Sequence, residues 1–263
     1  MDSSSKSANP CDFSLSWPDS AEVRSPTRSA ALDLVKWLAL LTMLLDHLRF
    51  VWPDVSGLFL PGRVAFPLFC LAIAANVHRT NRGEVFSHSN HRYVGALLVF
   101  ALISEIPHRM LVGTDSATVN VLPTLALGLV VAWAVHHRTT SSIVLAVLAL
   151  AVSLSLERWI MYGVFGVMLP AALLMAIDRP RLIWLLPSAL NLLANCSPEL
   201  LRDAVVGELY PRLLVGVLIG APALGLWLLG REVNFSTPQV GLWGYWFYPA
   251  HLLVLCLAQW LHG

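Results

Sequence analysis

The chain has 263 residues, of which 57% are hydrophobic and 13% are charged, and its formal net charge at pH 7 is +1. An ordinary soluble domain carries about 25% charged residues, so this composition excludes a soluble fold and indicates a protein embedded in the lipid bilayer. The near-zero net charge predicts no nucleic-acid surface, and the four cysteines are too scattered to predict a disulfide framework or a metal site.

The first 29 residues differ from the rest of the chain. Residues 1–29 are rich in Ser and Pro and have almost no apolar periodicity, so we expect a disordered cytoplasmic tail. The first apolar run begins near Ala30 and is about as long as a membrane span, so we interpret it as a retained first helix and not as a cleaved signal peptide.

Nine apolar runs of spanning or near-spanning length follow the tail. They are 30–52, 62–78, 93–106, 119–135, 142–156, 160–177, 182–196, 211–230 and 242–260. Brief loops rich in Pro, Gly, Asn and Arg separate them and leave no room for a soluble domain. The sequence therefore predicts an all-α, polytopic transmembrane bundle of about nine helices in one domain, residues 30–263, with one or two short runs tilted or re-entrant.

The distribution of Lys and Arg predicts how the bundle is oriented. Ten of these residues lie in the tail and the even-numbered loops, and six lie in the odd-numbered loops. Basic loops face the cytoplasm. We therefore expect the N-terminus in the cytoplasm and the C-terminus outside.

The first run contains ionisable residues that a membrane helix rarely carries. Each Asp, Lys or Arg at a helix centre costs roughly 2.5–3.5 kcal/mol. Lys36 and His47 are eleven residues apart, which places both on one face and about 16 Å apart. His47 directly follows Asp46, so we expect a general base held in one tautomer by a carboxylate. For Asp33, Lys36 and Arg49, an interfacial ion pair and an outward-snorkelling arginine are the simpler interpretation.

The second and third runs add two further candidates. Arg63 precedes Pro67, and we expect this proline to kink the helix and direct the guanidinium toward an anionic or carbonyl ligand. An ordinary interfacial arginine is the alternative. Glu105 lies at the end of the third run, where we expect it to pair with Arg63 or Arg109.

The last run contains a second intramembrane imidazole. His251 follows Tyr248 by three residues, so both side chains share one helix face. A lone histidine there is more often structural. Beside a proline and several aromatic residues, it is a candidate site residue.

Several motifs occur in a fixed order along the chain. They are Lys36 with the string 43–47, Gly62–Phe69, Ile103–Pro107, Asn120, Tyr162–Val167 and Tyr248–Leu252. In this order they resemble the TraX family of conjugative-plasmid membrane proteins, the F-pilin acetylase type, and also the plasmid-encoded TrbP proteins. The family is similar to the wider membrane acyltransferases, whose first helix has a basic residue, ten residues and then histidine, a spacing that Lys36 and His47 fit.

The resemblance implies acetylation of the N-terminus of a pilin subunit at the bacterial inner membrane, with acetyl-coenzyme A (acetyl-CoA) as the donor on the cytoplasmic side. The expected catalytic residues are His47, Asp46 and His251. The expected residues for binding substrate or donor are Lys36, Arg63, Glu105, Asn120 and Tyr248. One difference from the family pattern is Met161, which stands where the family has Asp.

Two other classes of function fit the same residues. The first is a non-enzymatic assembly factor that binds pilin helices in the membrane. The second is a proton-coupled transporter that uses His47, Glu105 and His251, which is least favoured because the sequence shows no internal repeat.

Overall fold

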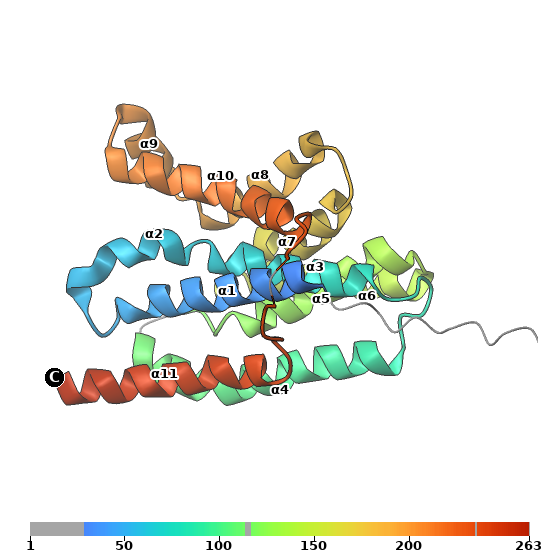
Figure 1. Cartoon of the computed structure of the whole chain (residues 1–263), viewed down its shortest axis with the longest axis horizontal. Helices are drawn as coiled ribbons and strands as arrows, with labels where there is room; N and C mark the ends of the chain where they lie inside the picture. Colours follow the sequence, from blue (N-terminus) through green and yellow to red (C-terminus); the bar gives the residue numbers. More distant parts are fainter. Residues whose placement is uncertain (1–28, 114–116, 235, 263) are drawn as a thin grey trace, which may run out of the picture.

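The computed structural model describes residues 29–113, 117–234 and 236–262, which form helices joined by turns (Figure 1). Residues 1–28 of the predicted tail lie outside the described residues. In chain order the elements are α1 (Ala30–Leu48), η1 (Pro53–Leu58), α2 (Phe59–Gly62), α3 (Ala65–His78), α4 (His88–Val112), α5 (Leu122–His137), α6 (Thr140–Ser155), α7 (Gly163–Ala176), η2 (Arg181–Trp184), α8 (Leu185–Asn195), α9 (Pro198–Val206), α10 (Leu209–Leu229) and α11 (Trp243–His262).

The all-α fold is confirmed, and each of the nine predicted apolar runs contains an α-helix. Polar residues begin several of these helices. The side chains of Ser29, Ser87, Thr139 and Ser197 each accept a hydrogen bond from a backbone N–H in the first turn of α1, α4, α6 and α9. Such caps satisfy N–H groups that have no partner inside the helix.

The second run is interrupted, but at a different place from the one we expected. We expected the kink at Pro67, whereas α2 ends at Gly62 and α3 begins at Ala65. Pro67 therefore lies in the first turn of α3, where a missing N–H removes no intrahelical hydrogen bond. The break instead leaves Arg63 between two short helical segments, beside the end of α1.

The helices form layers around α3, α5 and α7. Figure 1 shows α4 and α11 on one side of α1, and α8, α9 and α10 on the other side of α3. Leu68, Leu71, Leu129, Leu169 and Leu173 are fully buried in this core. The backbones of α5 and α7 approach closely at Gly128, where a Cβ atom would lie 2.7 Å from a ring carbon of Pro170.

The outer helices expose apolar side chains, as expected for a surface that faces lipid. Among the described residues, three helical segments are long and apolar enough to cross a membrane, namely Phe59–His78, His88–Val112 and Leu209–Leu229, and α5, α6 and α7 are shorter apolar helices. Leu102 and Ile106 of α4 and Val147 of α6 are more than half exposed. A soluble protein rarely exposes so much apolar surface. The chain is therefore a helical membrane protein.

Candidate functional site

A cavity of about 290 Å³ lies at the C-terminal end of α1, between α1, α3, α4 and α11. We call it the histidine cavity. Its polar lining side chains are Asp46, His47, Arg49, Arg63, His108, Thr118, Tyr162 and Tyr248. Four of the predicted site residues therefore line one cavity, although they come from three different parts of the chain.

His47 of α1 and His251 of α11 form a pair at this cavity. His251 Nδ1 lies 2.8 Å from the carbonyl oxygen of Phe247, and His251 Nε2 lies 2.8 Å from His47 Nδ1. Because a carbonyl only accepts, Nδ1 of His251 carries a proton, and the Nε2 of a neutral His251 must accept from His47. This assignment leaves a lone pair on Nε2 of His47, which has no hydrogen-bond partner in the described part of the chain.

Asp46 has different partners from the one we expected. We expected its carboxylate to orient His47, but Oδ2 accepts a hydrogen bond of 2.8 Å from Arg63, and Oδ1 lies 3.3 Å from Nε of Arg49. The reason is helix geometry, since neighbouring residues on a helix do not face each other. Asp46 therefore balances the charge of two guanidinium groups, and His251 is the partner of His47.

Aromatic rings pack against the two arginines and line the cavity. The guanidinium carbons of Arg63 and Arg49 lie 4.2 Å and 4.9 Å from the centre of the Phe59 ring, within cation–π range. The rings of Phe66 and Tyr162 are stacked with centres 3.9 Å apart. Both guanidinium groups are thus held at the cavity by packing as well as by charge.

Two glycines make room for these side chains. A Cβ atom on Gly62 would lie 2.5 Å from Cβ of Asp46, and one on Gly166 would lie 2.5 Å from Cβ of Tyr162. Real Cβ atoms do not approach so closely, because the interior is already densely packed. The first of these glycines belongs to a motif of the second run and explains why Asp46 reaches Arg63.

Several buried polar atoms around the histidine cavity have no hydrogen-bond partner within the described residues. They are Oδ1 of Asp46, Nε of Arg63 and Nδ1 of His108. Buried polar groups are nearly always hydrogen-bonded, so each exception needs a reason. A polar ligand in the cavity would supply partners for the two nitrogen atoms.

Glu105 and Asn120 are partners of each other. Glu105 accepts hydrogen bonds from the backbone N–H of Asn120 at 2.9 Å and from its side-chain amide at 2.7 Å, and it forms an ion pair with Arg109 at 2.7 Å. Asn120 also donates to the carbonyl of Ala101 and accepts from the N–H of Leu122. The predicted pairing of Glu105 with Arg109 is confirmed, and these bonds hold the segment before α5 against α4.

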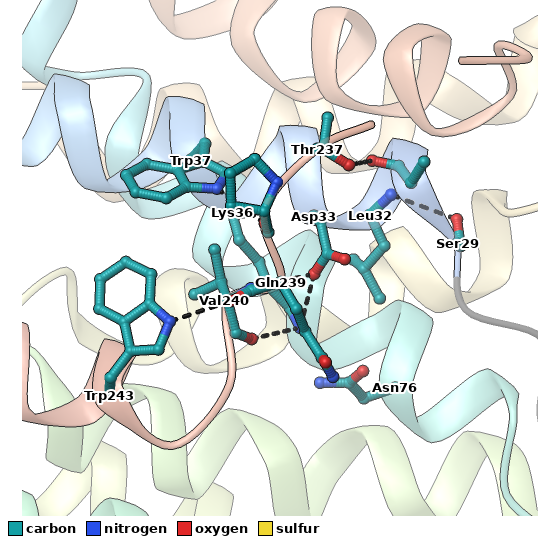
Figure 2. Close-up of polar contacts among 12 residues, drawn as sticks. Ser29, Leu32, Asp33, Lys36, Trp37, Asn76, Thr237, Gln239, Val240 and Trp243 are labelled. Atoms are coloured by element: carbon teal, nitrogen blue, oxygen red, sulfur yellow. Dashed lines mark hydrogen bonds and ion pairs between the residues drawn. The ribbon is translucent and has the colours of Figure 1, made fainter. Parts of the chain in front are cut away.

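Lys36 lies at a second, more apolar cavity of about 130 Å³. The two cavities are neighbours, because Met43, Phe69, Val121 and Tyr248 line both of them. The ammonium group of Lys36 donates to the carbonyl of Val240 at 3.3 Å and lies 3.9 Å from Asp33 (Figure 2). The expected Asp33–Lys36 ion pair is therefore present, as a long contact.

Four polar residues at the histidine cavity lie outside the predicted set, namely Arg49, His108, Thr118 and Tyr162. The sequence predicts an outward-pointing Arg49 and no role for the other three. Tyr162 begins the motif Tyr162–Val167. His108 directly follows Pro107 near the end of the third run, and only the tertiary structure shows that it reaches the cavity.

Comparisons with known proteins give a consistent result. The family model described as "TraX protein" matches residues 31–259. A protein from Escherichia coli (strain K12), "Protein TraX", is 28% identical over 222 residues, which cover 74% of this chain and 86% of that protein. No solved structure matches the chain significantly.

Proposed function

The chain belongs to the TraX family, and we propose that it is a membrane acetyltransferase that acetylates the N-terminal amine of a conjugative pilin subunit, with acetyl-CoA as the donor. The observation that carries this proposal is the His47–His251 pair, which leaves Nε2 of His47 as a proton acceptor at a cavity that also holds Arg63. A general base and a hydrogen-bond donor for the developing oxyanion are two kinds of group that catalyse acyl transfer to an amine.

The proposed reaction assigns one role to each group. The amine nitrogen attacks the thioester carbonyl carbon, and Nε2 of His47 takes a proton from the amine. The C–N bond forms, the C–S bond breaks, and the thiolate of coenzyme A leaves and takes the proton from His47. Arg63, whose Nε–H has no partner among the described residues, would donate to the oxygen that becomes negative during the attack.

Asp46 would act on Arg63 and not on His47. Its carboxylate lies between the two guanidinium groups, so it would hold Arg63 in one orientation and balance part of the positive charge. Tyr248 lines both cavities and would contact bound substrate or donor. For Lys36, Glu105 and Asn120, a direct contact with substrate or donor stays a prediction.

The proposed location is the bacterial inner membrane with α1 starting at the cytoplasmic side. Lys36 would then lie in the cytoplasmic half of the bundle, where acetyl-CoA arrives, and His47 would lie about 16 Å further along α1. The two neighbouring cavities would connect these positions. This arrangement supports a donor that enters from the cytoplasm and a reaction at His47.

Mass spectrometry of mature pilin tests the proposal. Pilin from cells with the intact gene should be heavier by one acetyl group than pilin from cells without it, and purified membranes given isotope-labelled acetyl-CoA should transfer the label to pilin. An unchanged pilin mass together with defective pilus assembly would instead support the alternative, a non-enzymatic assembly factor that binds pilin.

A further inference from the structure

The His47–His251 pair joins two helices that are held together mainly elsewhere. α11 packs along α4 for most of its length and has little contact with α1. The two imidazoles nevertheless meet with nitrogen atoms 2.8 Å apart. Besides the packing of α11 on α4, the segment that leads into α11 also contacts α1.

The contacts with α1 lie at the start of both helices, in the segment between α10 and α11. The backbone N–H of Val240 donates to Asp33 at 3.3 Å, and the carbonyl of Val240 accepts from Lys36 at 3.3 Å. Nearby, the indole N–H of Trp37 donates to the carbonyl of Pro238 at 2.9 Å. Figure 2 shows these side chains of α1 facing the backbone of the segment. We call this set of contacts the linker clamp.

The Lys36–Val240 contact of the linker clamp and the His47–His251 pair join α1 to the last segment of the chain with the same sequence separation. Lys36 and Val240 are 204 residues apart in the sequence, and so are His47 and His251. From the first contact to the second, both segments therefore advance by the same eleven residues. Trp37 and Trp243 also meet, with ring centres 5.2 Å apart, so α1 and α11 run in the same direction from the clamp to the pair. Because Val240 lies three residues before the start of α11 and His251 lies in its third turn, a displacement of the segment at Val240 would also displace His251.

We propose that Asp33 is a positioning residue for the His47–His251 pair, acting through the linker clamp. Asp33 is only 4% exposed, and its carboxylate bonds the backbone of Val240 and lies close to Lys36. A buried carboxylate in a membrane helix is costly without such partners. Its partners here hold the segment that leads into α11, and this segment also forms part of the wall of the Lys36 cavity.

Two substitutions at Asp33 separate its hydrogen bond to Val240 from its negative charge. Asp33→Asn keeps an oxygen that can accept from Val240, whereas Asp33→Leu removes the acceptor and leaves a buried N–H without a partner. Trp37→Phe removes one other bond of the clamp and leaves Asp33 in place. The matched control is Thr42→Val, because within the described residues the buried Thr42 hydroxyl bonds only to carbonyls of its own helix, those of Leu38 and Ala39.

The first measurement reports the geometry directly and needs no enzyme activity. His47→Cys and His251→Cys are combined in a full-length chain whose native cysteines are replaced, and the pair is joined with a short thiol-reactive spacer. A protease site in the exposed loop at Arg82 and Gly83 then shows whether the two halves stay linked. Asp33→Leu should lower the cross-linked fraction severalfold, Trp37→Phe should lower it less, and Asp33→Asn and Thr42→Val should leave it near the parent value.

The second measurement rests on the proposed function and uses the histidines intact. Asp33→Leu should lower kcat for pilin acetylation about tenfold or more, because small displacements of catalytic groups are costly. Asp33→Asn should retain most of the activity. A parent chain without acetylation would refute the proposed function and leave the cross-linking result standing. Equal cross-linking in Asp33→Leu and the parent, or an equal loss in Thr42→Val, would overturn the role of Asp33.

Discussion

Nδ1 of His47 lies 2.8 Å from Nε2 of His251, and the carbonyl of Phe247 fixes which nitrogen of the second ring carries its proton. The chain of hydrogen bonds thus runs from His47 to His251 to a backbone oxygen. Because Nδ1 of His251 donates to the carbonyl, Nε2 of His251 accepts from Nδ1 of His47, and Nε2 of His47 keeps a lone pair. His47 therefore presents Nε2 as a base, and among the described residues its ring bonds to His251 and not to a carboxylate.

This relationship predicts unequal effects for the two histidines. His47→Ala should lower acetylation by about 10²- to 10⁴-fold, the usual contribution of a general base, and should leave membrane insertion and abundance near wild type. His251→Ala should cause a smaller loss, because the base remains but its tautomer is no longer fixed. Pilin mass and immunoblots of membranes measure both. A fully active His47→Ala protein would remove His47 from the catalytic role.

A second prediction concerns the room that Gly62 leaves for Asp46. In Gly62→Ala the new Cβ would lie 2.5 Å from Cβ of Asp46, so Asp46 or α2 must move and the contact with Arg63 should weaken. Crowding of this kind costs about 1–3 kcal/mol. We expect a lower melting temperature in detergent and reduced acetylation.

Gly57→Ala is the matched control for Gly62→Ala. A Cβ atom on Gly57 would have no atom within 4 Å. Gly57 is exposed and lies, like Gly62, between α1 and α3. Its free energy of unfolding should change by less than about 0.5 kcal/mol. If both variants behave like the parent, the close packing of Asp46 against Gly62 does not matter for the site.

The sequence predicts the helices of this protein better than it predicts the contacts between them. Apolar runs of spanning length are local features, and a bilayer requires each of them to be a helix, so all nine predicted runs contain one. The inward position of Arg63 is one of two interpretations of the second run, and it results from the break between Gly62 and Ala65 and not from a kink at Pro67. The partner of His47 could not be predicted, because Asp46 is its neighbour in sequence but points elsewhere on the helix, and His251 is 204 residues away.

The third prediction concerns which side of the membrane each end of the chain faces. α1 and α11 run in the same direction, because Trp37 meets Trp243 near their starts and His47 meets His251 further along. The start of α1 and the end of α11 therefore lie at opposite ends of the bundle (Figure 1). With the basic loops inside, the tail should face the cytoplasm.

Cysteine labelling in cells with an impermeant reagent measures this orientation. In a chain whose other cysteines are replaced, native Cys11 should react only after the inner membrane is opened. A cysteine placed at Gly263 should react from outside. Labelling of both positions from one side would contradict the parallel arrangement of α1 and α11 across the bilayer.

The last prediction separates two roles of Lys36, binding the donor and pairing with Asp33. Lys36→Arg should keep measurable acetylation, since the charge and the hydrogen-bond donors are preserved. Lys36→Met should lose acetylation and also lower abundance, because it leaves the carboxylate of Asp33 without its nearest described cation. The double variant Asp33→Leu with Lys36→Met removes both charges at once, so we expect it to restore the amount of protein in the membrane but not its activity.

Immunoblots and pilin mass for the three variants give both quantities in one preparation. Full activity in the double variant would mean that Lys36 serves only to balance Asp33, and neither donor binding at Lys36 nor the linker clamp would then be needed for the reaction.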